Sequence, residues 1–145
     1  MVAKRRLLIF FLAMFVLPIA ACGQETAEAG HEAPAVMEEV EGSDISRIRL
    51  TESAMERLAL ETAPVEEAGS QLTVAYGAVF YGLGGDAWVY VNPEPRVFMR
   101  EHVELDRIDG DAAYLSAGPE PGTMVVTVGV AELFGTETGV GGSAH

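Results

Sequence analysis

The sequence predicts a mainly β domain, a small antiparallel barrel or roll of about six or seven strands with one short helix. Residues 73–134 carry short runs rich in Val, Tyr, Phe, Trp and Thr, separated by clusters of Gly, Pro, Asn and Asp. That alternation is typical of consecutive strands and turns. Asp109-Gly110 separates two such runs. Both residues tolerate a positive φ, so this dipeptide predicts a tight hairpin.

The N-terminus has the order of a secretory signal peptide. Basic residues 4–6 precede an apolar run, residues 7–21, which ends in small residues before Cys22. The run is shorter than the roughly twenty residues that span a bilayer as a helix. Ile-Ala-Ala-Cys resembles the lipobox of bacterial lipoproteins, so we expect residues 1–21 to be removed and Cys22 to be lipidated. An ordinary secreted protein with a chance cysteine and an uncleaved anchor are the alternatives.

Charge and cysteine usage exclude several classes of function. Cleavage before Cys22 leaves six basic and 22 acidic residues, a formal charge of −16. Such a surface repels nucleic acid, which needs basic patches, so a nucleic-acid partner is excluded. It also repels anionic lipid headgroups. Cys22 is the only cysteine, which excludes an intrachain disulfide and a cysteine-based metal site.

Residues 22–44 are predicted to be the acylated cysteine and a disordered acidic linker. Residues 23–44 hold seven acidic side chains, no Lys or Arg, and no sustained periodicity. One-sided charge with low hydrophobicity does not repay the entropy cost of folding. The linker would keep the folded part off the lipid while holding it near the membrane.

Residues 45–137 are predicted to form the folded domain, beginning with a strand over residues 45–50. Thr51 or Ser53 is placed to cap a short helix, and Ser53 has capping-box spacing to Glu56. Pro64 shows that this helix has ended. Its apolar stripe consists of Ala54, Met55, Leu58 and Ala59.

The strands that follow differ in their pattern. Residues 72–76 alternate, whereas 78–81 and 88–91 are nearly continuous, which predicts cover on both faces. Residues 97–105 keep one apolar parity except at Glu101, which predicts a bulge near residues 100–102. Residues 82–85 lack the Lys-Ser/Thr of a phosphate loop and are predicted to be a turn. Further predictions are a last strand over 125–128, a closing helical turn over 131–134 and a loose tail over 138–145.

Neither a catalytic site nor a metal or cofactor site is expected. The three histidines are scattered, and no serine lies in a nucleophile-elbow pattern. With 22 acidic residues, paired carboxylates arise by chance and carry no acid–base inference. Met99 and His102 are soft-metal ligand types, but they point to opposite faces of a regular strand. The sequence therefore predicts a protein that is not an enzyme.

The ordered set of features resembles the membrane-proximal domain of periplasmic adaptor proteins, also called membrane-fusion or HlyD-family proteins, of RND- and ABC-type efflux systems. The likeness runs from Ala78-Val79 through the glycine-rich turn, the strand 88–91 and the Asp-Gly turn. Residues 45–69 resemble the opening of these adaptors, but they join residue 71 directly, so the lipoyl and α-hairpin domains have no counterpart. The last matching positions are Gly118, Pro121, Gly122, Val125, Val126 and Gly129.

The resemblance implies a membrane-anchored lipoprotein outside the cytoplasm, in the periplasm or at the cell surface. It would dock on or modulate an inner-membrane RND- or ABC-type transporter or a full-length adaptor. Adaptors meet transporters through loops at one end, which selects two loops beside Trp88 as partner contacts. A free-standing lipoprotein that binds a metal ion or small ligand, and an envelope interaction module unrelated to transport, are the alternatives. The selected residues are Gly84, Asp86, Asn92, Glu94 and Arg96.

Overall fold

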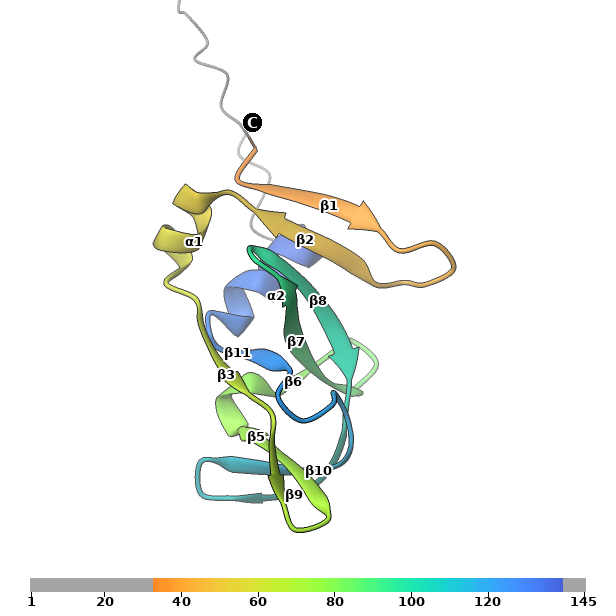
Figure 1. Ribbon diagram of the computed structural model, residues 1–145. Helices are drawn as coiled ribbons and strands as arrows, with labels where there is room; N and C mark the ends of the chain where they lie inside the picture. The colour runs from red at the N-terminus through yellow and green to blue at the C-terminus, as the bar shows by residue number, and fades with distance from the viewer. Residues whose placement is uncertain (1–32, 140–145) are drawn as a thin grey trace, which may run out of the picture. The chain divides into compact units, whose positions relative to one another are not determined.

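The computed structural model describes residues 33–139, which fold into two antiparallel sheets and two α-helices (Figure 1). The predicted mainly β class is confirmed. Within residues 33–139 the strands number eleven rather than six or seven. Residues 35–39 form a strand that was not expected, and the predicted run 97–105 divides into two strands. Neither sheet closes on itself: each has a first and a last strand in its order. No helix within the described residues is long and apolar enough to cross a membrane.

The larger sheet has seven strands in the order β1-β2-β8-β7-β11-β3, with β6 paired to β7. The smaller sheet has the order β4-β5-β10-β9. The larger sheet consists of β1 (Ala35–Glu39), β2 (Ser46–Leu50), β3 (Glu61–Pro64), β6 (Phe80–Tyr81), β7 (Ala87–Glu94), β8 (Val97–His102) and β11 (Met124–Val128). The smaller sheet consists of β4 (Glu66–Ala68), β5 (Gln71–Ala75), β9 (Glu104–Asp109) and β10 (Ala112–Ala117).

Strand β7 contributes to both hydrophobic cores. Val89 and Val91 belong to a cluster with Val74, Leu115 and other residues of the two sheets. Tyr90, between them, belongs to a second cluster under the helices. The near-continuous apolar run at residues 88–91 is therefore covered on both faces, as predicted. The second cluster comprises Ile48, Leu50, Ala54, Tyr90, Phe98, Val126, Val130 and Leu133.

Helix α1 (Glu52–Leu58) follows β2 directly, and Thr51 is its N-cap. The Thr51 hydroxyl accepts a hydrogen bond from the backbone N–H of Ala54 at 3.2 Å, so it satisfies one of the free donors at the helix start. Of the two predicted caps, Thr51 is confirmed and Ser53 is not. The helix ends at Ala59, which adopts the left-handed conformation with φ 46°.

The predicted hairpin at Asp109-Gly110 is present between β9 and β10. Asp109 pairs with Ala112, so Gly110 and Asp111 form the two-residue loop. Gly110 has φ 59°, the left-handed value that this turn requires. The loop lies one residue later than the sequence pattern indicates.

The linker prediction is wrong for residues 35–39, which form β1 and pair in register with β2. Composition reflects the one-sided charge of this segment but not the hydrogen bonds that its backbone can form. An edge strand needs hydrogen bonds to one neighbour only, and its side chains need no core. The N–H of Thr51 also donates to Pro34 O at 3.1 Å, which fixes the start of β1 beside α1. Cys22 and residues 140–145 of the predicted tail lie outside the described residues.

Three further local predictions are corrected. Helix α2 (Val130–Thr138) is longer than the predicted closing turn. Residues 76–78 form a 3₁₀ turn, η1 (Tyr76–Ala78), so only part of the predicted run 78–81 is a strand. Register shifts between Val91 and Glu94, while residues 99–102 pair regularly with β7. The bulge is thus at the end of β7, while Glu101, which is only half-buried, pairs regularly with Val89.

We predict that Gly129→Ala lowers the free energy of unfolding by about 2 kcal/mol or more. Gly129 has φ 88°, and an added Cβ would lie 2.1 Å from Leu60 Cδ2. Gly85→Ala is the matched control, since Gly85 has φ 87° and nothing within 4 Å of an added Cβ. Denaturant unfolding should show a smaller loss for Gly85→Ala; equal losses would show that Leu60 moves aside freely.

Candidate functional site

The five predicted contact residues lie at the two ends of β7. Gly84 and Asp86 are in the loop before it, Asn92 and Glu94 close its far end, and Arg96 is in the β7–β8 turn. At about 3.3 Å per residue, Asp86 and Asn92 are roughly 20 Å apart along the strand. The structure therefore brings together Asn92, Glu94 and Arg96 but separates them from the other two.

Asn92 shapes the β7–β8 turn from within. Its side-chain amide donates to Glu94 O at 2.7 Å and to Val97 O at 2.8 Å. Arg96 follows with φ 63°, an uncommon value for a residue with a Cβ, and its carbonyl accepts from the N–H of Leu50 at 2.9 Å. Asn92 thus holds the turn, and the turn is tied to β2. Of the three residues, Glu94 and Arg96 expose their side chains.

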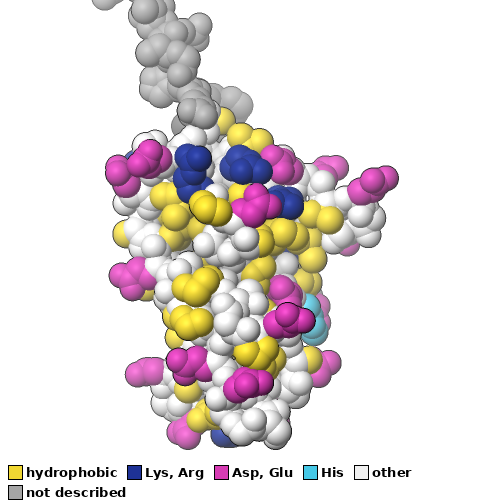
Figure 2. Space-filling model, viewed as in Figure 1, with side chains coloured by type: hydrophobic (Ala, Val, Ile, Leu, Met, Phe, Trp, Pro, Cys, Tyr) yellow, Lys and Arg dark blue, Asp and Glu magenta, His cyan; other side chains and the backbone are white. Residues whose placement is uncertain are grey.

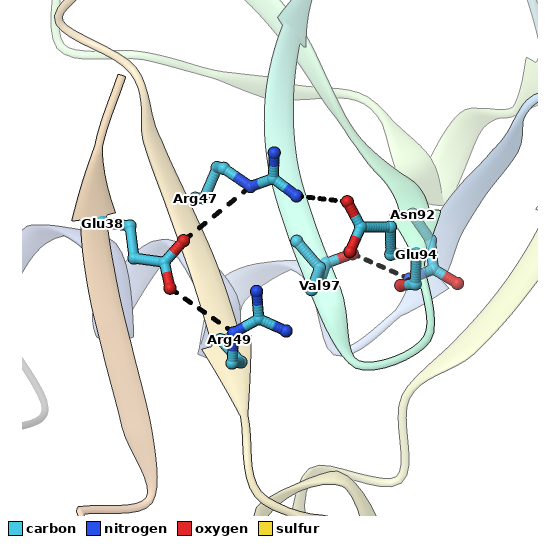
Figure 3. A network of polar contacts seen from close by, with 6 residues as sticks. All are labelled: Glu38, Arg47, Arg49, Asn92, Glu94 and Val97. Atoms are coloured by element: carbon cyan, nitrogen blue, oxygen red, sulfur yellow. Dashed lines mark hydrogen bonds and ion pairs between the residues drawn. The ribbon is translucent and has the colours of Figure 1, made fainter. Parts of the chain in front are cut away.

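Around this turn the charged side chains form a cluster that we name the arginine corner: Glu38, Arg47, Arg49, Glu94 and Arg96. Arg47 Nη2 lies 2.5 Å from Glu94 Oε1. The carboxylate of Glu38 lies between the two arginines of β2, 3.4 Å from Arg49 Nε and 4.0 Å from Arg47 Nε (Figure 3). The corner therefore joins β1, β2 and the β7–β8 turn.

The ion pairs of the arginine corner are exposed and contribute little to stability. The side chains of Arg47, Arg49, Glu38 and Glu94 are 32–54% exposed. Exposed pairs of this kind are worth about 0–1 kcal/mol each and are screened by salt. These side chains are thus accessible for an incoming charged group. Beside them is a hollow of about 350 Å³ lined by Val36, Arg49, Leu50, Thr51, Glu52, Ser53 and Arg96.

Sequence reasoning missed Glu38, Arg47 and Arg49. Composition predicts that Glu38 lies in the linker, where no strand is expected. Arg47 and Arg49 flank Ile48, which is fully buried, and alternation along a strand puts both arginines on the opposite, outer face. That alternation was a usable signal for the β2 pair. The partner Glu38 follows only from the register, in which it lies opposite Arg47.

The loop Gly82–Asp86 at the other end of β7 is a turn, as predicted. The N–H of Gly82 donates to Asp86 O and the N–H of Gly85 donates to Gly82 O, each at 2.9 Å. Leu83 at the tip is 96% exposed. Leu83, like Glu38, Arg47 and Arg49, is not among the residues that the sequence pattern selects. Tyr81, just before the loop, is also exposed.

A third group of side chains surrounds Trp88, which lies on the same face of the sheet as Tyr90. The guanidinium of Arg100 lies 4.9 Å from the Trp88 ring centre, and the His102 ring meets Trp88 edge-on at 5.3 Å. His102 is exposed, whereas Met99 packs against the first core, so the two predicted soft-ligand types do point apart. Among residues 33–139, no three His, Cys, Asp or Glu side chains gather as a metal-binding group would require.

Figure 2 shows how the charges are distributed over one face. Acidic side chains are spread over the whole face, while most of the dark-blue side chains gather near the top of this view. Comparisons with protein-family models, with curated proteins and with solved structures find no match to this chain.

We predict that Glu101→Gln raises the thermal midpoint at pH 7. Burial raises the pKa of Glu101, and the negative charge of Glu120 raises it further. A carboxyl whose pKa is higher in the folded state stabilises the fold below its unfolded pKa and loses that contribution as pH rises through its folded pKa. The gain from Gln should therefore shrink at about pH 4.

The control is Glu66→Gln, at an exposed glutamate of β4. Differential scanning fluorimetry at both pH values measures the effect. A gain for Glu101→Gln that is equal at pH 4 and pH 7 would mean that packing, rather than charge, causes it.

Proposed function

We propose that this chain is a non-enzymatic lipoprotein of the cell envelope whose β unit docks on an RND- or ABC-type efflux transporter or on a full-length adaptor. The proposal combines the signal-peptide and lipobox pattern with the resemblance to the membrane-proximal domain of periplasmic adaptors. Anchored through Cys22 outside the cytoplasm, it would assist or modulate the transporter. Without a hairpin domain it would not by itself reach an outer-membrane channel.

The observation that carries the docking proposal is the arginine corner. After position 21 the chain has six basic residues against 22 acidic ones, and three of the six, Arg47, Arg49 and Arg96, lie around one turn. Complementary charge steers encounter and selects partners, so the arginines of an acidic protein are natural contact points for an acidic partner. Arg47 and Arg49 lie on β2, and the turn that carries Arg96 is fixed to this strand. The Leu50–Arg96 backbone hydrogen bond and the Arg47–Glu94 side-chain bond make this connection, so the turn is presented rigidly.

We predict that Cys22→Ser releases the protein from the membrane fraction or stalls its processing. The thiol is the atom that a diacylglyceryl group would modify, and serine does not replace it. Fractionation and intact-mass measurement of the mature chain provide the readout. A Cys22→Ser protein that is cleaved and sediments with membranes like the wild type would remove the lipoprotein part of the proposal.

We predict that the double variant Arg49→Gln, Arg96→Gln reduces co-purification of a transporter or adaptor several-fold, while the thermal midpoint changes little. Both side chains are exposed, so the fold does not depend on them. The measurement is affinity capture from detergent-solubilised membranes, followed by quantitative mass spectrometry.

Two matched variants separate the candidate surfaces. Arg107→Gln removes an exposed arginine of β9, on the smaller sheet, and should leave capture unchanged. Leu83→Ser tests the loop at the other end of β7 in the same assay. Loss of capture with Leu83→Ser alone would move the contact to that loop. The absence of any transporter or adaptor from the wild-type capture would overturn the docking proposal.

A further inference from the structure

Arg57 is an arginine that does not belong to the arginine corner. Arg57, in the last turn of α1, borders a groove of about 390 Å³ between β1, α1 and α2. Helices α1 and α2 lie close to β1 and β2 in Figure 1. Volumes of this size are usual for sites that hold a small molecule. The groove is separate from the hollow beside Arg49 and Arg96, although Leu50 borders both.

The walls of the groove are apolar because two elements turn their apolar faces toward it. On β1, Ala35 and Met37 share one face, opposite the face of Glu38. On α1, Ala54, Arg57 and Leu58 are spaced by three and four residues, so they share one side of the helix. Leu50 and Ala54 are 3% exposed and form the floor. Ala54 is small, which leaves the space above it open.

Arg57 is the only charged residue among those that line the groove. Within the described part of the chain it has no ion pair within 4.0 Å and no side-chain hydrogen bond. The one other polar side chain in the lining, Thr136, already donates its hydroxyl to Glu132 O at 2.8 Å. The groove thus offers a long apolar surface and a single cationic group at its rim.

That chemistry selects a class of ligand. A peptide would bring backbone N–H and C=O groups that the apolar side chains of the lining do not pair, and burying them unpaired is costly. A fully apolar ligand would gain nothing from Arg57. An alkyl chain with one anionic head would cover the apolar surface and place its charge beside the guanidinium.

We propose that this groove binds a single-chain anionic amphiphile, such as a fatty acid carboxylate, with the alkyl chain between β1 and α1 and the carboxylate at Arg57. The proposal does not rest on transporter docking: the residues that line the groove belong neither to the β7–β8 turn nor to the loop Gly82–Asp86. In a protein with a formal charge of −16 after residue 21, a groove whose only charge is positive is the place where an anionic amphiphile meets least repulsion.

The test uses residues 23–145, which include all the described sheets and helices of residues 33–139, and sodium decanoate as the probe. The methionine methyl groups are labelled with ¹³C and followed by NMR. Met37 lines the groove, whereas Met99 on β8 and Met124 on β11 do not. Decanoate should shift the Met37 methyl signal saturably and leave those of Met99 and Met124 in place.

Chain length and charge are then varied separately. From hexanoate to decanoate the affinity should rise by up to about fourfold per methylene, which corresponds to ~0.8 kcal/mol. Arg57→Gln should weaken decanoate binding about fivefold and leave binding of the neutral decanol unchanged. Arg107→Gln, an exposed arginine of the smaller sheet, is the matched control and should bind decanoate like the wild type.

Each contrary result overturns the proposal. If the Met37 signal does not move at millimolar decanoate, the groove is closed or filled by the chain itself. If all methionine signals move together, decanoate acts as a surfactant without a site. If Arg57→Gln binds decanoate as tightly as the wild type does, the guanidinium does not recognise the anionic head.

Discussion

The burial of Tyr90 in the middle of β7 is the constraint on which the rest of this fold depends. Its ring is fully buried and stacks on Phe80 at 4.7 Å, and its hydroxyl donates to Glu137 Oε2 at 2.6 Å. Burial raises the pKa of Tyr90, and the hydrogen bond to Glu137 raises it further, so the hydroxyl stays protonated and remains a donor. The carboxylate of Glu137 is itself only 6% exposed, and Arg100 Nε lies 3.2 Å from it as an ion pair. Removing either Arg100 or Glu137 would leave the charge of the other without its partner, which is strongly destabilising. One tyrosine therefore joins the central strand to the last turn of α2.

This central position of β7 also explains why the two predicted contact loops differ in character. An antiparallel strand paired on both sides sends its connections to opposite ends, so the loops cannot meet. At one end the bulge and the Asn92 side chain hold a rigid polar turn against β2. At the other end glycines flank the exposed Leu83. A partner that contacts both loops must extend along the whole of β7. A smaller partner contacts either the polar turn or the loop with Leu83, but not both.

The features that depend on a local sequence pattern are predicted correctly. Those that depend on which strands or side chains pair across the fold are not. Apolar runs, the Asp-Gly hairpin and the Thr51 cap depend on a few neighbouring residues, and all three are present. Strand β1 cannot be predicted from composition, because it forms through backbone hydrogen bonds to β2, a strand that composition does not identify as its partner. The position of the bulge is set by the side-chain amide of Asn92, which donates to two carbonyl groups in the turn. It is not set by the charge of Glu101. The length of α2 depends on Glu137 reaching Tyr90, 47 residues away in sequence.

Strand β1 contributes to both the arginine corner and the groove beside Arg57, because its side chains alternate between two faces. Its outer face presents Glu38 to the arginines of β2, while its other face presents Met37 to the groove beside Arg57. Apart from the partly buried Ala35, it contributes no side chain to the cores, so it is held by one set of backbone bonds and by exposed ion pairs. Segments with few buried contacts open at low free energy. A ligand that contacts β1 in its paired position stabilises that position by mass action. Occupation of the groove would therefore also keep Glu38 between Arg47 and Arg49. The net charge of the arginine corner thus depends on whether β1 stays paired with β2.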